Sequence, residues 1–178
     1  MTLLRAHRAI DDVEQRHLEH ILRFASVEPA CFHRTTLPGH ITGSAFIYDP
    51  ATDSLLLHHH RKLDRWLQMG GHDDGEQDAA ATAFREAREE SGLNRLRLAE
   101  PVQVLDVDVH LIPARKDEPA HDHLDVRFLV LGDSTEPLSR DDVESKDLRW
   151  FPLEEAARQM GEPGALRVVK KIRASFRR

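Results

Sequence analysis

The sequence contains one cysteine, Cys31, in 178 residues. A lone cysteine excludes an internal disulfide, and we expect it to be a small buried residue in a protein of the reducing cytoplasm. No apolar run is long enough to span a membrane, and the first residues lack the apolar segment of a secretion signal. The net charge is −6 and no basic stripe runs through the chain, so we expect neither a membrane nor a stable nucleic-acid partner.

The order of the apolar patterns predicts an α/β fold. Amphipathic helices are expected in an N-terminal extension, about 1–30, which offers a surface for a homodimer, and at the C-terminus, about 163–178. Between them, segments with the alternation of β-strands precede and follow one central helix. This order predicts a single domain over 1–178, in which helices cover both faces of a mixed β-sheet.

Alternating polarity assigns faces to three expected strands. The strand over 124–131 directs its apolar residues to a core, so the opposite face carries His123, Asp125 and Arg127. In the strand over 40–48, His40 belongs to the polar face, and the apolar face carries Ile41, Ala45 and Ile47. In the strand over 102–111, one face is expected to carry Leu105, Val107, Val109 and Leu111.

The stretch 70–93 concentrates the residues that suggest chemistry. It reads GGHDDGEQDAAATAFREAREESGL, in which the glycine pair is expected to form a tight turn and Gly92 to end a helix. On this helix, Glu86, Glu89 and Glu90 lie at i, i+3 and i+4 and therefore share one face. Like charges at this spacing repel each other, so we expect the face to hold a divalent cation together with substrate phosphates. The alternative is a charged face exposed to solvent.

This stretch resembles the Nudix box, in which a glycine, five residues, a glutamate and seven residues precede Arg-Glu-aliphatic-x-Glu-Glu-x-Gly-aliphatic. The matching residues are Gly71, Arg85, Glu86, Glu89, Glu90, Gly92 and Leu93. Two positions depart from the box. Its first glutamate falls on Gln77, so the neighbouring Glu76 is expected to take the structural role, and its aliphatic residue is Ala87. The resemblance covers roughly 40–160 and implies the Nudix α/β/α sandwich with a mixed β-sheet.

The resemblance also implies a reaction. Nudix hydrolases use Mg²⁺ or Mn²⁺ and water to cleave phosphoric anhydrides, so the expected substrate is a small-molecule diphosphate, a nucleoside diphosphate linked to another group (NDP-X). The ion is expected on Glu86, Glu89, Glu90 and the backbone carbonyl of Gly71. Arg85 is expected to orient the glutamates through charge-assisted hydrogen bonds. The general base varies within the family, and the candidates are Glu89 and Glu144.

Some of the twelve histidines form a second pattern. They resemble the metal site of isopentenyl diphosphate isomerase, a divergent Nudix relative that holds a transition metal with three histidines and two glutamates. His33 and His40 have the spacing of its first two histidines, and His72 follows Gly71 as its third does. This resemblance implies a site for Zn²⁺, Mn²⁺ or Fe²⁺ formed by His33, His40, His72, His123 and Asp125. The alternative is that these histidines bind diphosphate or backbone through hydrogen bonds.

The catalytic cysteine of the isomerase is replaced here by Gly70, so we expect a hydrolase. Two alternatives remain open: an isomerase-like diphosphate enzyme, and a non-catalytic Nudix domain that senses a nucleotide or a metal. His110, Arg127 and Arg115 could contact substrate, although ordinary packing or a solvated charge explains each of them equally well.

Overall fold

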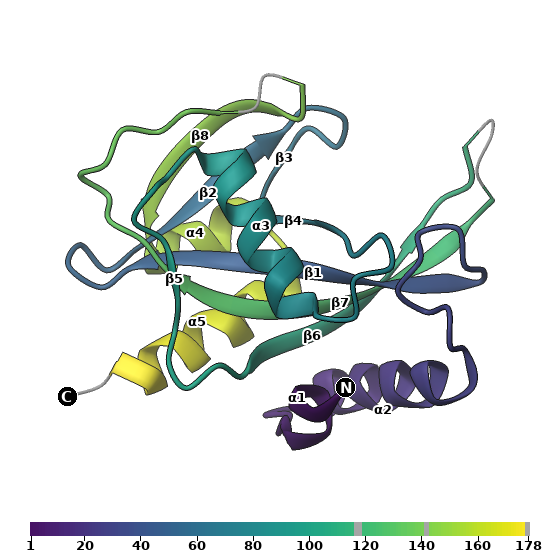
Figure 1. Cartoon of the computed structure of the whole chain (residues 1–178). Coiled ribbons are helices and arrows are strands. Elements are labelled where there is room, and N and C mark those ends of the chain that lie inside the picture. Colours follow the sequence, from purple (N-terminus) through teal and green to yellow (C-terminus); the bar gives the residue numbers. More distant parts are fainter. Residues whose placement is uncertain (116–118, 141–142, 177–178) are drawn as a thin grey trace.

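Figure 1 shows the computed structural model, which describes residues 1–115, 119–140 and 143–176. The helices are α1 (Thr2–Ala6), α2 (Asp12–Val27), α3 (Ala79–Ser91), α4 (Leu153–Met160) and α5 (Pro163–Phe176). The strands are β1 (Gly39–Asp49), β2 (Ser54–His60), β3 (Arg65–Leu67), β4 (Met69–His72), β5 (Arg97–Leu98), β6 (Val104–Ile112), β7 (His121–Leu131) and β8 (Ser145–Pro152). Residues 177–178, expected in the C-terminal helix, lie outside the described part.

The strands form one mixed sheet around β1. Strand β7 runs parallel to β1 and pairs with it from Gly39 to Tyr48. The other edge of β1 is shared by two antiparallel strands, β4 beside 42–45 and β2 beside 47–49. Strands β3 and β8 pair with β2, and strands β5 and β6 pair with β7, all antiparallel. This topology places β4, the strand that leads into α3, directly beside the central strand β1.

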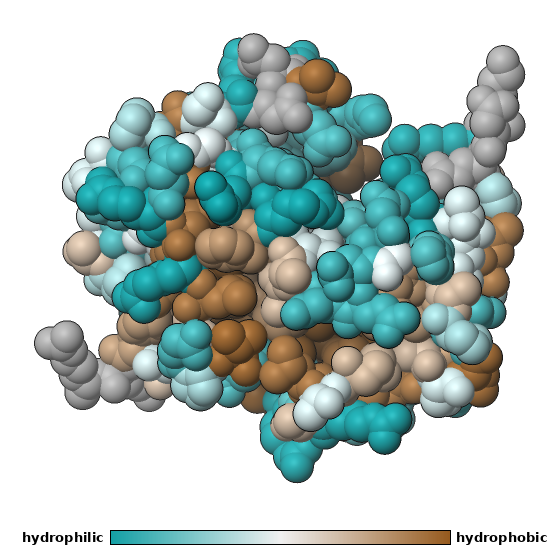
Figure 2. Space-filling view, in the orientation of Figure 1, coloured by the Kyte–Doolittle hydropathy of each residue, from teal (hydrophilic) through white to brown (hydrophobic). Residues whose placement is uncertain are grey.

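Helices cover both faces of this sheet (Figure 1). On one face, α2 and α3 pack on a buried cluster that includes Ile41, Ala45, Ile47, Leu124, Val126, Phe128 and Cys31. On the other face, α4 and α5 pack on a cluster that includes Phe46, Leu129 and Leu131. The faces predicted for β1 and β7 are therefore confirmed, as is the α/β fold with a mixed sheet. Figure 2 shows hydrophilic side chains over the C-terminal half of α3 and apolar surface between α3 and α5.

The face predicted for β6 is wrong at its first residues. The pairing of β6 with β7 shifts between Val104 and Asp106, so Leu105 lies in a β-bulge. Leu105 consequently packs in the α4/α5 cluster, whereas Val107 packs in the α2/α3 cluster. Leu111, also expected on the apolar face, is exposed near the tip of the β6–β7 hairpin.

The tight turn expected at Gly70 and Gly71 is also wrong. Both glycines are strand residues of β4 and pair with Ser44 and Gly43 of β1. The chain turns later, where Asp74 and Gly75 have positive φ angles of 48° and 94°. The glycine pair serves close packing here, because Cβ atoms at these positions would collide with side chains from β1 and α3.

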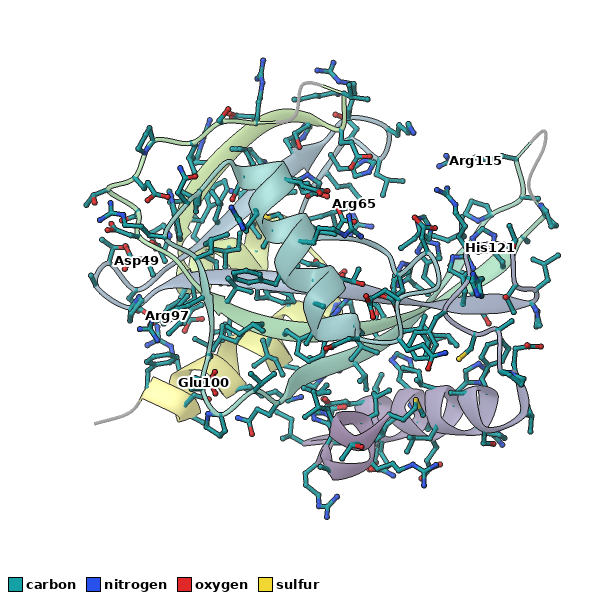
Figure 3. The ribbon with its side chains drawn as sticks, viewed as in Figure 1. Asp49, Arg65, Arg97, Glu100, Arg115 and His121 are labelled. Atoms are coloured by element: carbon teal, nitrogen blue, oxygen red, sulfur yellow. The ribbon has the colours of Figure 1, made fainter. Side chains whose placement is uncertain are left out.

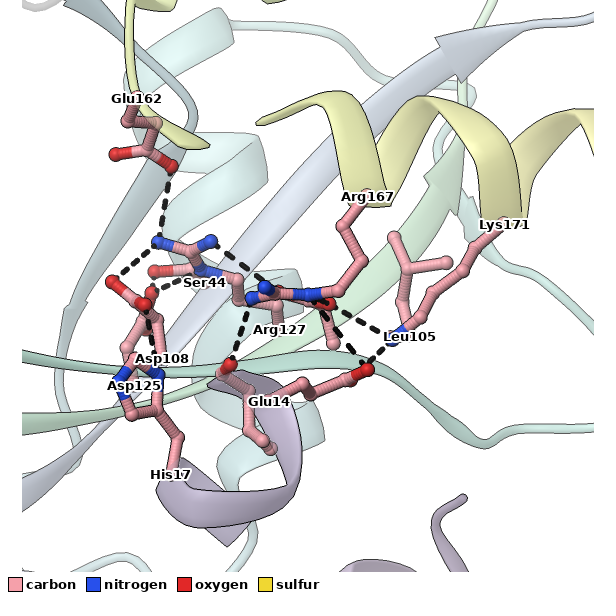
Figure 4. Close-up of polar contacts among 12 residues, drawn as sticks. Glu14, His17, Ser44, Leu105, Asp108, Asp125, Arg127, Glu162, Arg167 and Lys171 are labelled. Atoms are coloured by element: carbon pink, nitrogen blue, oxygen red, sulfur yellow. Dashed lines mark hydrogen bonds and ion pairs between the residues drawn. The ribbon is translucent and has the colours of Figure 1, made fainter. Parts of the chain in front are cut away.

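A buried ion network joins the N-terminal and C-terminal helices to the sheet (Figure 4). Glu14 of α2 is fully buried and pairs with Lys171 of α5, which also contacts Asp106 of β6 at 2.8 Å. Arg167 of α5 binds the same Asp106 at 2.7 Å.

Among the helices that the structure describes, none combines the length and the hydrophobicity of a membrane-spanning segment.

Candidate functional site

Local sequence fixes both ends of α3. Asp78 is the N-cap, and its carboxylate accepts hydrogen bonds from backbone N–H groups of the first turn. Gly92 ends the helix in the left-handed conformation, with φ 69°, which a glycine adopts without strain. Glu76, expected in the structural role of this loop, is exposed, and the helix is capped by Asp78 instead. On the side of the helix that faces the sheet, Ala80, Ala83 and Ala87 are buried.

Glycines bring α3 into direct contact with β1 and β4. A Cβ on Gly43 would lie 2.5 Å from the carbonyl oxygen of Ala79, and a Cβ on Gly71 would collide with the carboxylate of Glu86. The Glu86 carboxylate therefore lies on the backbone of β4, where any larger residue than glycine would displace it. Two residues expected to bind the ion, Glu86 and Gly71, are adjacent for this reason.

Arg85 connects the glutamates to β4. Its Nη1 atom lies 2.8 Å from Oε1 of Glu86 and 3.1 Å from Oε2 of Glu89. Its Nη2 atom donates a hydrogen bond of 3.1 Å to the backbone carbonyl of His72. One guanidinium thus orients two carboxylates and the strand beside them, the geometry expected of a group that positions metal ligands.

Glu90 is buried, unlike Glu89. Its Oε2 atom lies 3.4 Å from Nδ1 of His58, and the same His58 nitrogen lies 2.9 Å from Oγ of Ser145. Burial, together with the neighbouring His60 and His59, lowers the pKa of His58 to about 4, so the ring is neutral at pH 7. Residues of β2, α3 and β8 therefore meet at the His58 ring.

Negative charge accumulates at Glu86. Burial raises the pKa of Glu86, and the charges of Glu89 and Glu144 raise it further, against the opposing effect of Arg85. Glu144, which precedes β8, is therefore close enough to act on the Glu86 carboxylate. Glu89 is the most accessible of the three box glutamates, with a side chain 60% exposed. Both general-base candidates, Glu89 and Glu144, thus contribute to the negative charge that acts on Glu86.

The histidines gather on the other side of β4. Since Gly71 faces α3, the next residue, His72, faces the opposite side of the sheet. There His40, His72 and His123 each have one ring nitrogen that lies within 4.8 Å of the corresponding nitrogens of the other two. His121 lies beside this group, with its ring stacked 5.0 Å from that of His40 and tilted, at 5.2 Å, against that of His123. Burial and the neighbouring histidines lower the pKa of His123 to about 2.

Two residues expected in the histidine site lie outside this group of three histidines. His33 packs against Gly75 in the loop that follows β4. The Asp125 carboxylate accepts hydrogen bonds from Oγ of Ser44 at 2.7 Å and Nε of Arg127 at 2.8 Å. Of the five residues predicted for this site, the structure therefore brings together His40, His72 and His123, while the Asp125 carboxylate is hydrogen-bonded by its strand neighbours.

The three residues considered for substrate contact have different environments. Arg127 is buried among carboxylates, with Asp125, Asp106, Asp108 and Glu162 all within 3.4 Å of its guanidinium, so ion pairs occupy the group that would have met phosphate. His110 is half-exposed at the rim of the histidine cluster, 5.4 Å from the ring of His123. Arg115 is exposed on the connection from β6 to β7, on the same side of the molecule as His121 (Figure 3).

The sequence patterns did not place His58 beside Glu90, or His121 beside His40 and His123. His121 was missed because β7 begins at His121, three residues before the predicted strand, which puts His121 on the face of His123. His58 lies on the same face of β2 as Leu56, the face covered by α3, and this alternation was the available signal. Ser145 carries no signal, because its partner is 87 residues away.

A helix whose Arg85 and Glu86 contact a glycine-containing strand of a mixed sheet is the central feature of this site. The NUDIX domain model matches residues 39–172, so the chain belongs to the Nudix family and is a hydrolase that acts on pyrophosphate bonds. No curated protein matches the sequence.

Several solved structures share the fold. A NUDIX-family hydrolase from Clostridium perfringens is 27% identical, with a TM-score of 0.58, over 76% of this chain and 97% of that one. A C. elegans Ap4A hydrolase in a binary complex is 18% identical, with a TM-score of 0.57, over 76% of this chain and 96% of that one. The E. coli dihydroneopterin triphosphate pyrophosphohydrolase is 14% identical, with a TM-score of 0.52, over 74% of this chain and 92% of that one.

Proposed function

We propose that this protein is a metal-dependent pyrophosphohydrolase that cleaves the diphosphate linkage of a nucleoside diphosphate derivative, NDP-X. The observation that carries this proposal is the arrangement around Arg85, which holds Glu86 and Glu89 beside the backbone of β4. Acidic side chains gathered in this way at the glycine strand can receive a cation and the phosphates that it brings.

The residues present fit a hard divalent cation. Glu86 lies in a space that a Cβ on Gly71 would fill, and burial and neighbouring carboxylates raise its pKa. A cation bound beside Glu86 would offset the negative charge of these carboxylates. The oxygen donors of Glu86, Glu89, Glu90 and the Gly71 carbonyl suit Mg²⁺ or Mn²⁺ better than softer metals.

The bound cation would neutralise charge on the diphosphate oxygens and lower the pKa of the attacking water. The residues of the chain supply positioning and proton transfer. Arg85 and His58 hold Glu86, Glu89 and Glu90 in place before substrate arrives. Glu89 and Glu144 are the carboxylates that could accept the proton of the water, and the exposure of Glu89 favours it.

The names of two similar structures, an Ap4A hydrolase and a dihydroneopterin triphosphate pyrophosphohydrolase, support a small-molecule substrate with linked phosphates. Base recognition is left to loops around the site, so a panel of nucleoside diphosphate derivatives is the direct test. Product formation and phosphate release are measured with Mg²⁺, Mn²⁺ and Zn²⁺ compared.

The variant Glu89→Gln tests the assignment of the site. It keeps the shape of the side chain and removes its charge, so we expect turnover with Mg²⁺ to fall by about 100-fold or more while the melting temperature stays within a few degrees. Glu100→Gln, on the connection between β5 and β6, is the matched control (Figure 3). Unchanged turnover in Glu89→Gln would remove this residue from the site.

The same panel separates the alternatives. Rearranged product without released phosphate or monophosphate would indicate the isomerase-like enzyme. Tight binding of a nucleotide without turnover of any substrate would indicate a ligand-sensing domain.

A further inference from the structure

The histidine cluster is built on strands, which fix it more firmly than loops would. His40 and His123 lie directly opposite each other in the parallel pair β1/β7. His72 of β4 lies opposite Thr42, two residues from His40 on the same face of β1. Backbone ladders therefore hold three imidazoles together, and one ring nitrogen from each lies within 4.8 Å of the others.

His121 is arranged as a fourth member. It is buried, and its ring is stacked on His40 at 5.0 Å with an interplanar angle of 28°. Its Nδ1 atom donates a hydrogen bond of 2.9 Å to the backbone carbonyl of Pro119, which places the lone pair of the ring on Nε2. Metal-binding histidines are commonly oriented by a hydrogen bond of this kind from the second ring nitrogen.

We infer that His40, His72, His121 and His123 form an all-imidazole site for one transition-metal ion. Asp125 is excluded from the ligand set because Ser44 and Arg127 occupy its oxygens. A set of nitrogen donors without carboxylate favours Zn²⁺, Co²⁺, Ni²⁺ or Cu²⁺ over Mg²⁺ or Mn²⁺.

This site is distinct from the carboxylates of α3. A side chain at position 71 would point toward α3, whereas the side chain of His72 lies on the opposite face of the same strand. The ion would join β1, β4 and the first residues of β7, so it would hold the β6–β7 hairpin to the centre of the sheet. The inference does not rest on the proposed hydrolysis.

The first experiment is a titration of the full chain, without a histidine tag and freed of metal by a chelator that is then removed. Co²⁺ is the probe, followed by calorimetry and by its visible absorption. We expect one ion per chain, an absorption band typical of nitrogen ligands, displacement by Zn²⁺ and none by a ~100-fold excess of Mg²⁺. Absence of stoichiometric binding would overturn the inference.

The second experiment compares variants by the same titration. His72→Ala and His123→Ala are expected to weaken Co²⁺ binding by at least about 100-fold, and His121→Ala by about 10-fold or more. His20→Ala, on α2, is the matched control and should bind as the parent does. Undiminished binding by both His72→Ala and His123→Ala would overturn the site.

Thermal unfolding shows whether a variant that fails to bind Co²⁺ is still folded. At a ~100-fold excess over its dissociation constant, Co²⁺ should raise the melting temperature of the parent by roughly 5–10 °C, and that of His72→Ala far less. His72 lies on a short strand and is only partly buried, so this variant is expected to retain the fold. Glu89→Gln should keep the Co²⁺ site even where it loses turnover, which separates this inference from the proposed function. Loss of the Co²⁺ site in Glu89→Gln would show that the two sites are one.

Discussion

Arg85 shows how one side chain can orient two carboxylates. Its planar guanidinium reaches Glu86 and Glu89 from one nitrogen and the His72 carbonyl from another. A lysine would keep the charge but could not hold three oxygens in this fixed arrangement, because its ammonium is a single point on a flexible chain. We therefore expect the geometry of Arg85, more than its charge, to matter in the proposed site.

We therefore predict that Arg85→Lys lowers kcat by about 10- to 100-fold, as is typical when a group that orients metal ligands is altered. The concentration of Mg²⁺ needed for half-maximal rate should rise with it. Steady-state kinetics over a range of Mg²⁺ concentrations measure both quantities. A loss confined to the KM for substrate would instead place Arg85 in contact with the substrate.

The residues of this site differ in how far the sequence could predict them. The positions of Arg85, Glu86 and Glu89 follow from helical spacing, which local sequence determines. The burial of Glu90 does not, because it depends on His58 from β2 and Ser145 from β8, which are brought there by the whole sheet. Local periodicity predicts which residues share a face but not what the rest of the chain places opposite them.

At the scale of elements, the contact of α3 with β1 and β4 depends on two glycines with different neighbours. The space beside Gly71 is filled by the end of the Glu86 side chain, which can move. The space beside Gly43 is filled by the backbone of Ala79, which cannot move without shifting the helix. A larger residue at position 71 should therefore disturb mainly the Glu86 carboxylate, whereas a larger residue at position 43 should disturb mainly the stability of the fold.

We predict that Gly71→Ala lowers Mg²⁺-dependent turnover by at least about 10-fold, because a ligand is displaced, with under about 1.5 kcal/mol lost in the free energy of unfolding. Gly43→Ala should instead destabilise the fold by about 1–3 kcal/mol through overpacking. Denaturant unfolding and turnover are measured on both variants. Equal losses of stability in the two would contradict the distinction.

Strand faces were predictable where the ladder is regular and not where it is interrupted. The alternation in β1 and β7 gave the right faces because their pairing has no bulge. In β6 the bulge at Leu105 reverses the face for the residues before it, and no local signal marks it. Gly70 and Gly71 were misread as a turn because a glycine pair serves a turn and a close strand–helix contact equally well.

At the scale of the whole molecule, buried charges connect the two ends of the chain. Arg127 lies at the centre of β7 with four carboxylates around it, and Asp106 links it to Arg167 and Lys171 of α5. The partners Glu14 and Lys171 are 157 residues apart. Alone, Glu14 matches a helix-capping pattern and Lys171 a solvated face, so this network could not be read from the sequence.

The network predicts a loss of stability in acid. Burial alone would raise the pKa of Asp108, but a hydrogen bond from His110 and the charge of Arg127 prevail and lower it to about 2. A lowered folded-state pKa stabilises the fold above the unfolded value near 4, and this contribution disappears as pH falls toward 2. Asp108→Asn should therefore be less stable than the parent by about 1–2 kcal/mol at pH 6. The difference should vanish near pH 2, which melting curves across this range would test.

Glu14 tests whether the N-terminal extension and the sheet unfold together. Burial opposes its ionisation, but hydrogen bonds from His7 and Lys171 hold its pKa well below the usual range. Glu14→Gln leaves Lys171 and Arg167 without this charge, so we predict a loss of about 2–4 kcal/mol in the free energy of unfolding. Glu19→Gln, on the exposed side of α2, should change it by less than about 0.5 kcal/mol.

Two probes report separate parts of the molecule in this experiment. The fluorescence of Trp66 and Trp150 follows the sheet, and hydrogen exchange of the α2 amides follows the extension. Because Leu18 and Ile21 of α2 belong to the same buried cluster as β1 and β7, we expect Glu14→Gln to shift both transitions together. A variant in which α2 exchanges freely while the tryptophan transition stays in place would show that the extension is docked on an independently stable Nudix domain.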